Sequence, residues 1–153
     1  MFFSKIHLFL IKKNIKNRLT NVSHNGSASS VKKVGVILDE KYIDFKEKIQ
    51  KILIKNSVLE KNIKFIIFTN SPKKEDQAVA DRFSIKDFKS NATINSSRLN
   101  WFIDENFDLL INYYDEKNPM MMLLTQLTAS NFKIGFASID KRLNHLIIQT
   151  KAT

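Results

Sequence analysis

The chain has 153 residues, of which 43% are hydrophobic, and this is typical of one domain with its own core. It contains no cysteine, which excludes disulfides, thiolate nucleophiles and cysteine zinc sites. The formal net charge is +10, but residues 1–33 hold seven basic and no acidic side chains, whereas the other 120 residues hold 18 basic and 15 acidic ones. The charge excess therefore lies in an N-terminal arm.

This arm is predicted to contain an amphipathic helix over residues 2–19. Apolar side chains such as Leu8, Ile11 and Ile15 recur at spacings of three and four residues. The basic side chains that fill much of the other side are Lys5, Lys12, Lys13, Lys16 and Arg18. Its apolar run at residues 6–11 is far shorter than the roughly 18–20 residues of a membrane span, and we expect neither a span nor a signal peptide.

A linker follows this helix, because Asn, Ser and Gly dominate the next stretch and no apolar periodicity crosses it. We therefore divide the chain into a basic amphipathic helix at 1–20, a linker at 21–32 and an α/β domain at 33–153.

Short apolar runs predict the strands of this domain, at residues 34–38, 63–68, 107–113, 132–136 and 145–149. Helices are expected at 43–55, 98–104 and 119–129, and a loop at 73–97. Strands that alternate with helices indicate a Rossmann-like three-layer α/β sandwich with a mostly parallel sheet of about five strands, in which the first strand is central. The last strand is expected to pair antiparallel at an edge, because the connection at 137–144 is too short for a helical crossover. The predicted core comprises Val36, Leu38, Ile66, Phe68, Leu109, Ile111, Ile134 and Phe136.

A candidate ligand site follows from the fold, because open α/β sheets bind ligands beyond the carboxyl ends of their strands. The polar and aromatic residues expected there are Asp39, Tyr113, Tyr114, Asp115, Asp140, Arg142 and Asn144. They suit a sugar, a nucleotide or a phosphate, but polar residues end strands in most α/β proteins, and local pairing of Asp140 with Arg142 is the favoured interpretation of that turn. No glycine-rich phosphate loop, nucleophile elbow or metal-ligand spacing is present, so we expect no cofactor and no metal.

Several segments resemble an uncharacterised bacterial family of unknown function. They are VGVILDE at 34–40, FDLLINYYD at 107–115, FKIGFA at 132–137 and DKRLNH at 140–145. The resemblance covers most of the chain and implies a Rossmann-like domain with no assigned activity. It also implies a final helix after the last strand, so the chain is expected to be shortened at its C-terminus, with one sheet face partly bare. Residues 107–136 are similar to the N-terminal half of lipopolysaccharide heptosyltransferases, a likeness that supports the fold and transfers no active site.

Two functions remain open. The first is a non-enzymatic binding or interaction protein of the bacterial cytoplasm, in which residues 1–20 dock on the domain or on a protein partner, or attach to the anionic inner face of a membrane. The second is a small ligand-binding domain or enzyme that uses the strand-end loops on a sugar, nucleotide or phosphate. Nucleic acid is the less favoured partner, because the domain shows no basic stripe and no RNA-binding motif.

Overall fold

A computed structural model describes residues 2–18, 21–22, 30–70, 81–150 and 152. The helices in these ranges are α1 (Phe2–Arg18), α2 (Lys46–Lys55), α3 (Ser97–Ile103) and α4 (Pro119–Leu127), with short 3-10 helices η1 (Glu40–Phe45), η2 (Glu60–Asn62), η4 (Ile85–Asp87) and η5 (Lys141–Leu143). The strands are β1 (Val34–Asp39), β2 (Ile63–Phe68), β3 (Arg82–Phe83), β4 (Phe107–Tyr113), β5 (Ser130–Phe136) and β6 (Leu146–Ile148).

The described strands form one sheet in the order β3-β2-β1-β4-β5-β6, and every neighbouring pair is parallel. Strand β1 is central, since Val36 pairs with Phe65 on one side and with Ile111 on the other. The chain builds outward from β1 in one direction through β3 and in the other from β4 onward. This reversal places the topological switch point between β1 and β4.

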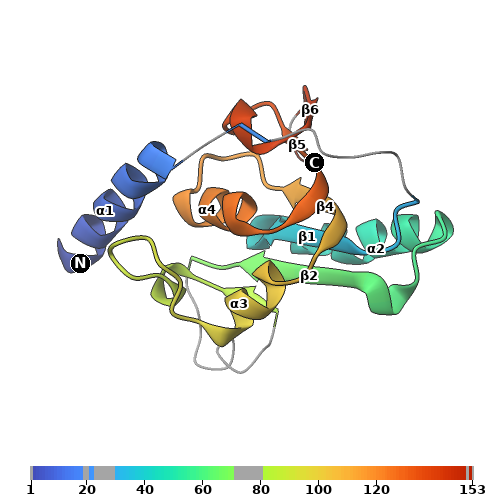
Figure 1. Cartoon of the computed structure of the whole chain (residues 1–153), viewed down its shortest axis with the longest axis horizontal. Coiled ribbons are helices and arrows are strands. Elements are labelled where there is room, and N and C mark those ends of the chain that lie inside the picture. Colours follow the sequence, from blue (N-terminus) through green and yellow to red (C-terminus); the bar gives the residue numbers. More distant parts are fainter. Residues whose placement is uncertain (1, 19–20, 23–29, 71–80, 151, 153) are drawn as a thin grey trace.

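Helices cover both faces of the sheet, which explains why β1 is buried along its whole length. On one face, Val34 and Val36 pack with Leu53 of α2. On the other, Ile37 and Leu110 belong to a larger core with α3 and α4. Figure 1 shows these layers, with α4 lying in front of the sheet and α2 behind it. The Rossmann-like three-layer α/β prediction is confirmed.

Helix α4 begins as its sequence predicts. Pro119 occupies the first turn, where a missing N–H costs nothing, and the Asn118 side chain accepts hydrogen bonds from the next free backbone N–H groups. The residues from Met120 to Thr125 are all buried between the sheet and α1. The methionine triplet is therefore part of the core.

Helix α1 lies against α4 at one end of the molecule, as Figure 1 shows. Ile11 is fully buried and Leu8 partly so, both in the same core as α4. The Asn14 amide also donates to the Ser90 carbonyl at 3.4 Å. The apolar stripe of the N-terminal helix thus packs on the domain. Most of the predicted linker, residues 23–29, lies outside the described residues.

The direction of the last strand differs from the prediction, because β6 is parallel to β5. The pairing joins Ile134 to Leu146 and Phe136 to Ile148, so only the last residues of β5 are involved. The chain must therefore return by only about two residues, or roughly 7 Å, and η5 suffices where a full helical crossover would not fit. Strand β3 lies within the stretch predicted to be a loop and brings the sheet to six strands.

The predicted core is correct for β1 and β2 but takes the wrong face of β4. Phe107, Leu110 and Asn112 are the buried residues there, while Leu109 and Ile111 are only partly covered by α2. Ile134 of β5 is also only partly buried, whereas Phe136 is buried. The more deeply buried face of β4 is the one under α4.

One part of the α2 face is left open, over β5 and β6. An apolar groove of about 220 Å³ lies there, between α2 and these strands. Large apolar side chains stay substantially exposed around it, namely Ile52, Phe132, Leu146 and Ile148. Parallel sheets are generally covered on both faces, so this opening is unusual for the fold.

Candidate functional site

A compact ion-pair cluster lies beyond the carboxyl ends of β1 and β4, at the switch point. Lys41 is its centre: the ammonium nitrogen is 2.9 Å from Asp115 Oδ1 and 2.6 Å from Glu116 Oε1. Asp39 Oδ1 accepts a hydrogen bond of 3.1 Å from the Lys41 backbone N–H. Of the predicted site residues, the structure thus brings Asp39 and Asp115 to one place. Lys41, which links them, was not predicted.

The ionisation of this cluster is set by one lysine and three carboxylates. Burial raises the pKa of Asp39. Burial also opposes ionisation of Asp115, but hydrogen bonds from Lys41 and Tyr42 outweigh it, so the pKa of that carboxyl is lowered. For Lys41 the hydrogen bonds with Glu116 and Asp115 likewise outweigh desolvation and raise its pKa. A lysine held charged by two carboxylates is a structural pivot, and it is a poor general base at neutral pH.

Tyr113 and Tyr114 are adjacent in sequence but lie in different environments. Tyr113 packs beside the cluster in an aromatic group, with ring centroids 5.6 Å from Tyr42 and 5.5 Å from Phe136. Tyr114 is fully buried, and its hydroxyl lies 2.7 Å from Thr125 Oγ1. Because burial raises the pKa of Tyr114, this phenol stays neutral. Only Tyr113 lies near the strand-end surface.

Asn144 is buried in a polar network below the strand ends. The Asn112 amide donates to Asn144 Oδ1 at 2.7 Å, and Asn112 Oδ1 accepts from Thr125 Oγ1 at 2.8 Å. The Asn144 side chain lies over Gly135, where an added Cβ would come within 2.5 Å of Asn144 Nδ2. Glycine at 135 therefore leaves the space that this amide occupies, and the network ties β4, β5 and α4 together.

Asp140 and Arg142 form a closed pair at the turn after β5. Arg142 Nε donates to Asp140 Oδ1 at 2.9 Å, and Arg142 Nη2 lies 2.7 Å from Asp140 Oδ2. The side-chain hydrogen bond from Arg142 lowers the pKa of Asp140. This is the local pairing of Asp140 with Arg142 that the sequence offered as the alternative to ligand binding. Asp39, Asp115 and Arg142 line neither the apolar groove beside α2 nor the cavities of about 450 and 610 Å³ elsewhere in the described structure.

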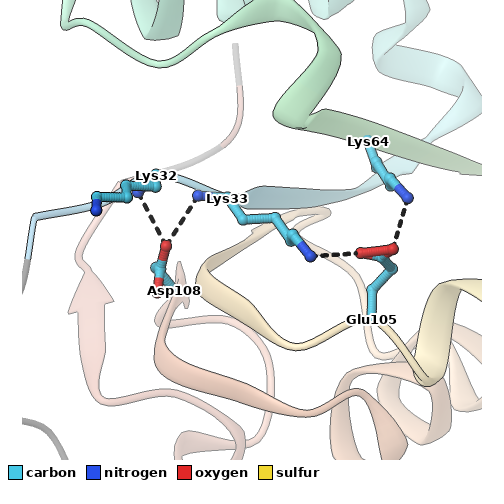
Figure 2. Close-up of polar contacts among 5 residues, drawn as sticks. All are labelled: Lys32, Lys33, Lys64, Glu105 and Asp108. Carbon is cyan, nitrogen blue, oxygen red and sulfur yellow. Dashed lines mark hydrogen bonds and ion pairs between the residues drawn. The ribbon is translucent and has the colours of Figure 1, made fainter.

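Lysines at the opposite end of the sheet are held by acidic residues, as Figure 2 shows. Glu105 pairs with Lys64 at 2.7 Å and with Lys33 at 3.1 Å, and the hydrogen bond from Lys64 is the main cause of its lowered pKa. Asp108 Oδ2 accepts from the backbone N–H groups of Lys32 and Lys33, each at 2.9 Å. These contacts join the beginnings of β1, β2 and β4, and Glu105 shares its charge between two lysines of the domain.

Lys133 of β5 is a buried lysine that the sequence did not single out. Only 7% of it is exposed, and its ammonium donates to the Thr125 carbonyl at 2.7 Å, in the last turn of α4. Within the described residues it has no carboxylate partner, and it lines a polar cavity of about 450 Å³ at the amino ends of β4 and β5. Burial lowers the pKa of Lys133 to about 8. The Lys133 ammonium therefore caps a carbonyl at the C-terminal end of α4, and its charge is destabilised by removal from water.

This cost makes the stability of the fold depend on pH. Between about pH 8 and 10.5 the unfolded chain binds the Lys133 proton and the folded chain has released it, so the free energy of unfolding rises with pH there. We expect wild type to gain up to roughly 3 kcal/mol over this window relative to Lys133→Met, which has no ammonium to desolvate. Urea unfolding of both proteins at several pH values measures the difference, and a difference that stays constant with pH would refute the assignment.

The outward face of α1 combines basic and apolar side chains. Phe9 is 64% exposed and Ile6 41% exposed, and Lys5, Lys12 and Lys13 are exposed around them. Lys16 and Arg18, the other predicted basic residues of the arm, have side chains outside the described part of the structure. None of the helices described is long and apolar enough to cross a membrane.

A further cavity lies beyond the carboxyl ends of β2 and β3, in the segment predicted to be a loop. It is the largest of those described, with a volume of about 610 Å³, and it includes Arg82, Lys86 and Arg98. One pattern in the sequence indicates local structure in this segment. The spacing Ser84-x-x-Asp87 is that of a capping box, and the structure contains one at η4.

Comparison with known proteins agrees with the sequence resemblance. A family model described as a family of unknown function (DUF6913) matches residues 7–153, almost the whole chain. No curated protein and no solved structure matches the chain, so the local likeness to heptosyltransferases gains no support.

Proposed function

The chain belongs to DUF6913, a family of unknown function, and from this premise we propose that it is a non-enzymatic binding protein that attaches to an anionic membrane surface through the outer face of α1. The observation that carries the proposal is the exposure of Phe9 among lysines at the i−4, i+3 and i+4 positions. A helix with basic residues around an exposed aromatic ring suits the interface between headgroups and acyl chains.

The inner face of α1 packs on the domain, which leaves the outer face for a partner. Ile11 is fully buried against the domain, so docking already uses the inner apolar stripe. Docking leaves Phe9 and Ile6 exposed at the surface. The helix contains no acidic residue to offset Lys5, Lys12 and Lys13. The outer face therefore combines exposed apolar side chains with charged side chains that are all basic, which suits an anionic lipid surface.

The expected affinity is modest. Three lysines near an anionic surface contribute about 1 kcal/mol each, or about a hundredfold in the binding constant. Partial insertion of Phe9 adds about 1–2 kcal/mol. Attachment of this strength is reversible and falls with salt, as in proteins that visit a membrane surface from the bacterial cytoplasm.

Neutralising the outer face should remove this attachment. We expect the triple variant Lys5→Gln, Lys12→Gln, Lys13→Gln to bind vesicles of phosphatidylcholine and phosphatidylserine about a hundredfold more weakly than wild type. Co-sedimentation at low and high salt measures the binding. The matched control is the triple variant Lys48→Gln, Lys51→Gln, Lys55→Gln, which removes the same charge from exposed positions of α2.

The control decides between a specific surface and the net charge. Equal losses in both triple variants would mean that overall charge, and no particular face, attracts the protein to the vesicles. Wild-type protein that stays in the supernatant at low salt would remove the proposal altogether. We expect vesicle binding to be lost only in the α1 triple variant and not in the α2 triple variant. We also expect Phe9→Ser to bind vesicles more weakly than wild type.

A further inference from the structure

We infer that the cavity beyond the carboxyl ends of β2 and β3 binds a small molecule that carries a phosphate group. The cavity has a volume of about 610 Å³, within the range of natural small-molecule sites. It is distinct from α1 and from the Lys41 cluster, and the inference does not depend on membrane attachment. Its lining includes Arg82, Lys86, Arg98 and the hydroxyl residues Thr69, Ser84 and Ser97.

The two arginines are held in place by carboxylates. Arg82 Nη1 lies 2.6 Å from Glu40 Oε1, and Arg98 Nη2 lies 3.2 Å from Asp87 Oδ1. Asp87 is itself fixed, because its Oδ2 accepts a 2.8 Å hydrogen bond from the Ser84 N–H. Both guanidinium groups remain partly open to solvent. Guanidinium groups fixed in this way need little reorganisation to bind an oxyanion.

The balance of charge favours an anion. Among the described lining residues, three cationic side chains accompany one carboxylate, Asp87, and Glu40 pairs with Arg82 from outside the lining. Lys86 is exposed and forms no ion pair with any described residue. A phosphate group suits this lysine together with the surrounding hydroxyl residues.

The size of the cavity indicates a phosphorylated organic molecule. A single phosphate ion needs only a small part of about 610 Å³, so most of the cavity is left for an organic group. Thr69 follows β2 and Phe83 ends β3, so the cavity lies at the carboxyl ends of the strands, the end of the sheet at which α/β folds bind ligands. The class of ligand is therefore a phosphate monoester of a small polar compound.

Nuclear magnetic resonance titration of the full chain tests the site, with glycerol 3-phosphate as the probe and glycerol and sodium chloride as controls. We expect saturable shifts of the Ser84, Lys86 and Ser97 amide signals with the phosphate probe alone. Lys86→Gln should weaken binding about tenfold, the loss of one charge-assisted contact. Lys89→Gln removes the same charge from an exposed position outside the lining, and it should leave binding unchanged.

Three results would overturn the inference. They are equal losses in the Lys86 and Lys89 variants, shifts spread over the lysines of α1 with none at the cavity, and no saturable shift with the probe. The variant of α1 in which Lys5, Lys12 and Lys13 are glutamine should bind the probe as wild type does. The site and the membrane surface can thus fail independently.

Discussion

Replacing Leu110 by alanine lowers the free energy of unfolding by about 2–5 kcal/mol, the range for removing a large buried aliphatic side chain from a packed core. Leu110 is fully buried in the core beneath α4, together with Phe107 and Leu124. The neighbours belong to a strand and a helix fixed by many contacts, so the cavity left by the substitution cannot collapse. Urea unfolding followed by circular dichroism measures the loss.

Leu109 is the matched control for this substitution. It is the residue before Leu110 in β4, has the same side chain and is only partly buried on the α2 face. The expected cost of Leu109→Ala is less than half that of Leu110→Ala, because the side chain already contacts solvent and less apolar surface returns to water. A larger cost at Leu109 would mean that the two faces of β4 have been exchanged, and equal costs would mean that both faces are equally buried.

Replacing Asn112 by alanine has a second large effect, for a different reason. Asn112 donates to Asn144 and accepts from Thr125, and both partners are buried. The substitution leaves two buried polar groups without this partner, at about 1–3 kcal/mol each, so we expect a loss of about 4 kcal/mol. Thermal and urea unfolding measure this loss.

A double-mutant cycle separates hydrogen bonding from packing at this position. Thr125→Val removes the hydroxyl that donates to Asn112 and keeps the shape of the side chain. If the network is real, the costs of the two substitutions do not add, and the coupling is about 1 kcal/mol or more. Additive costs would show that Asn112 and Thr125 act separately.

The sequence predicts most of the fold because several strands are continuous apolar runs. The short, β-branched runs in β1 and β2 favour strands covered on both faces, and the Asn118-Pro119 pair marks the beginning of α4. Strand β3 has only two residues, too few for any periodicity to be visible. The direction of β6 was predicted wrongly because a short connection excludes a parallel crossover only when the chain must return along the whole preceding strand. Here β6 pairs with the last residues of β5 alone, so a short connection is enough.

The buried face of β4 could not be predicted because its sequence is apolar on both faces. Alternation assigns a face only when polar and apolar residues alternate, and Leu109, Leu110 and Ile111 are all apolar. The beginning of the strand is also irregular: the backbone N–H groups of Asp108 and Leu109 both donate to the Lys33 carbonyl. Counting from the first apolar residue therefore does not identify the inner face.

The rule for strand ends predicts that Asp39 and Asp115 lie close together. Both are at the carboxyl ends of neighbouring strands, since Asp39 ends β1 and Asp115 follows β4. The rule could not show that Lys41 lies between them, since that contact depends on the path of η1. Tyr113 and Tyr114 do not both face one site, because Tyr113 ends β4 beside the cluster and the side chain of Tyr114, just after the strand, is buried in the core.

The open apolar groove beside α2 has a consequence for the behaviour of the protein at high concentration. Exposed Ile52, Leu146 and Ile148 attract other copies of the chain, while the net charge of +10 repels them. Added salt screens the repulsion, with a Debye length of about 8 Å at physiological ionic strength, and leaves the apolar attraction in place. Colloidal stability therefore rests on the same lysines that would hold the chain to a membrane, and dilute buffers of low ionic strength keep the copies apart.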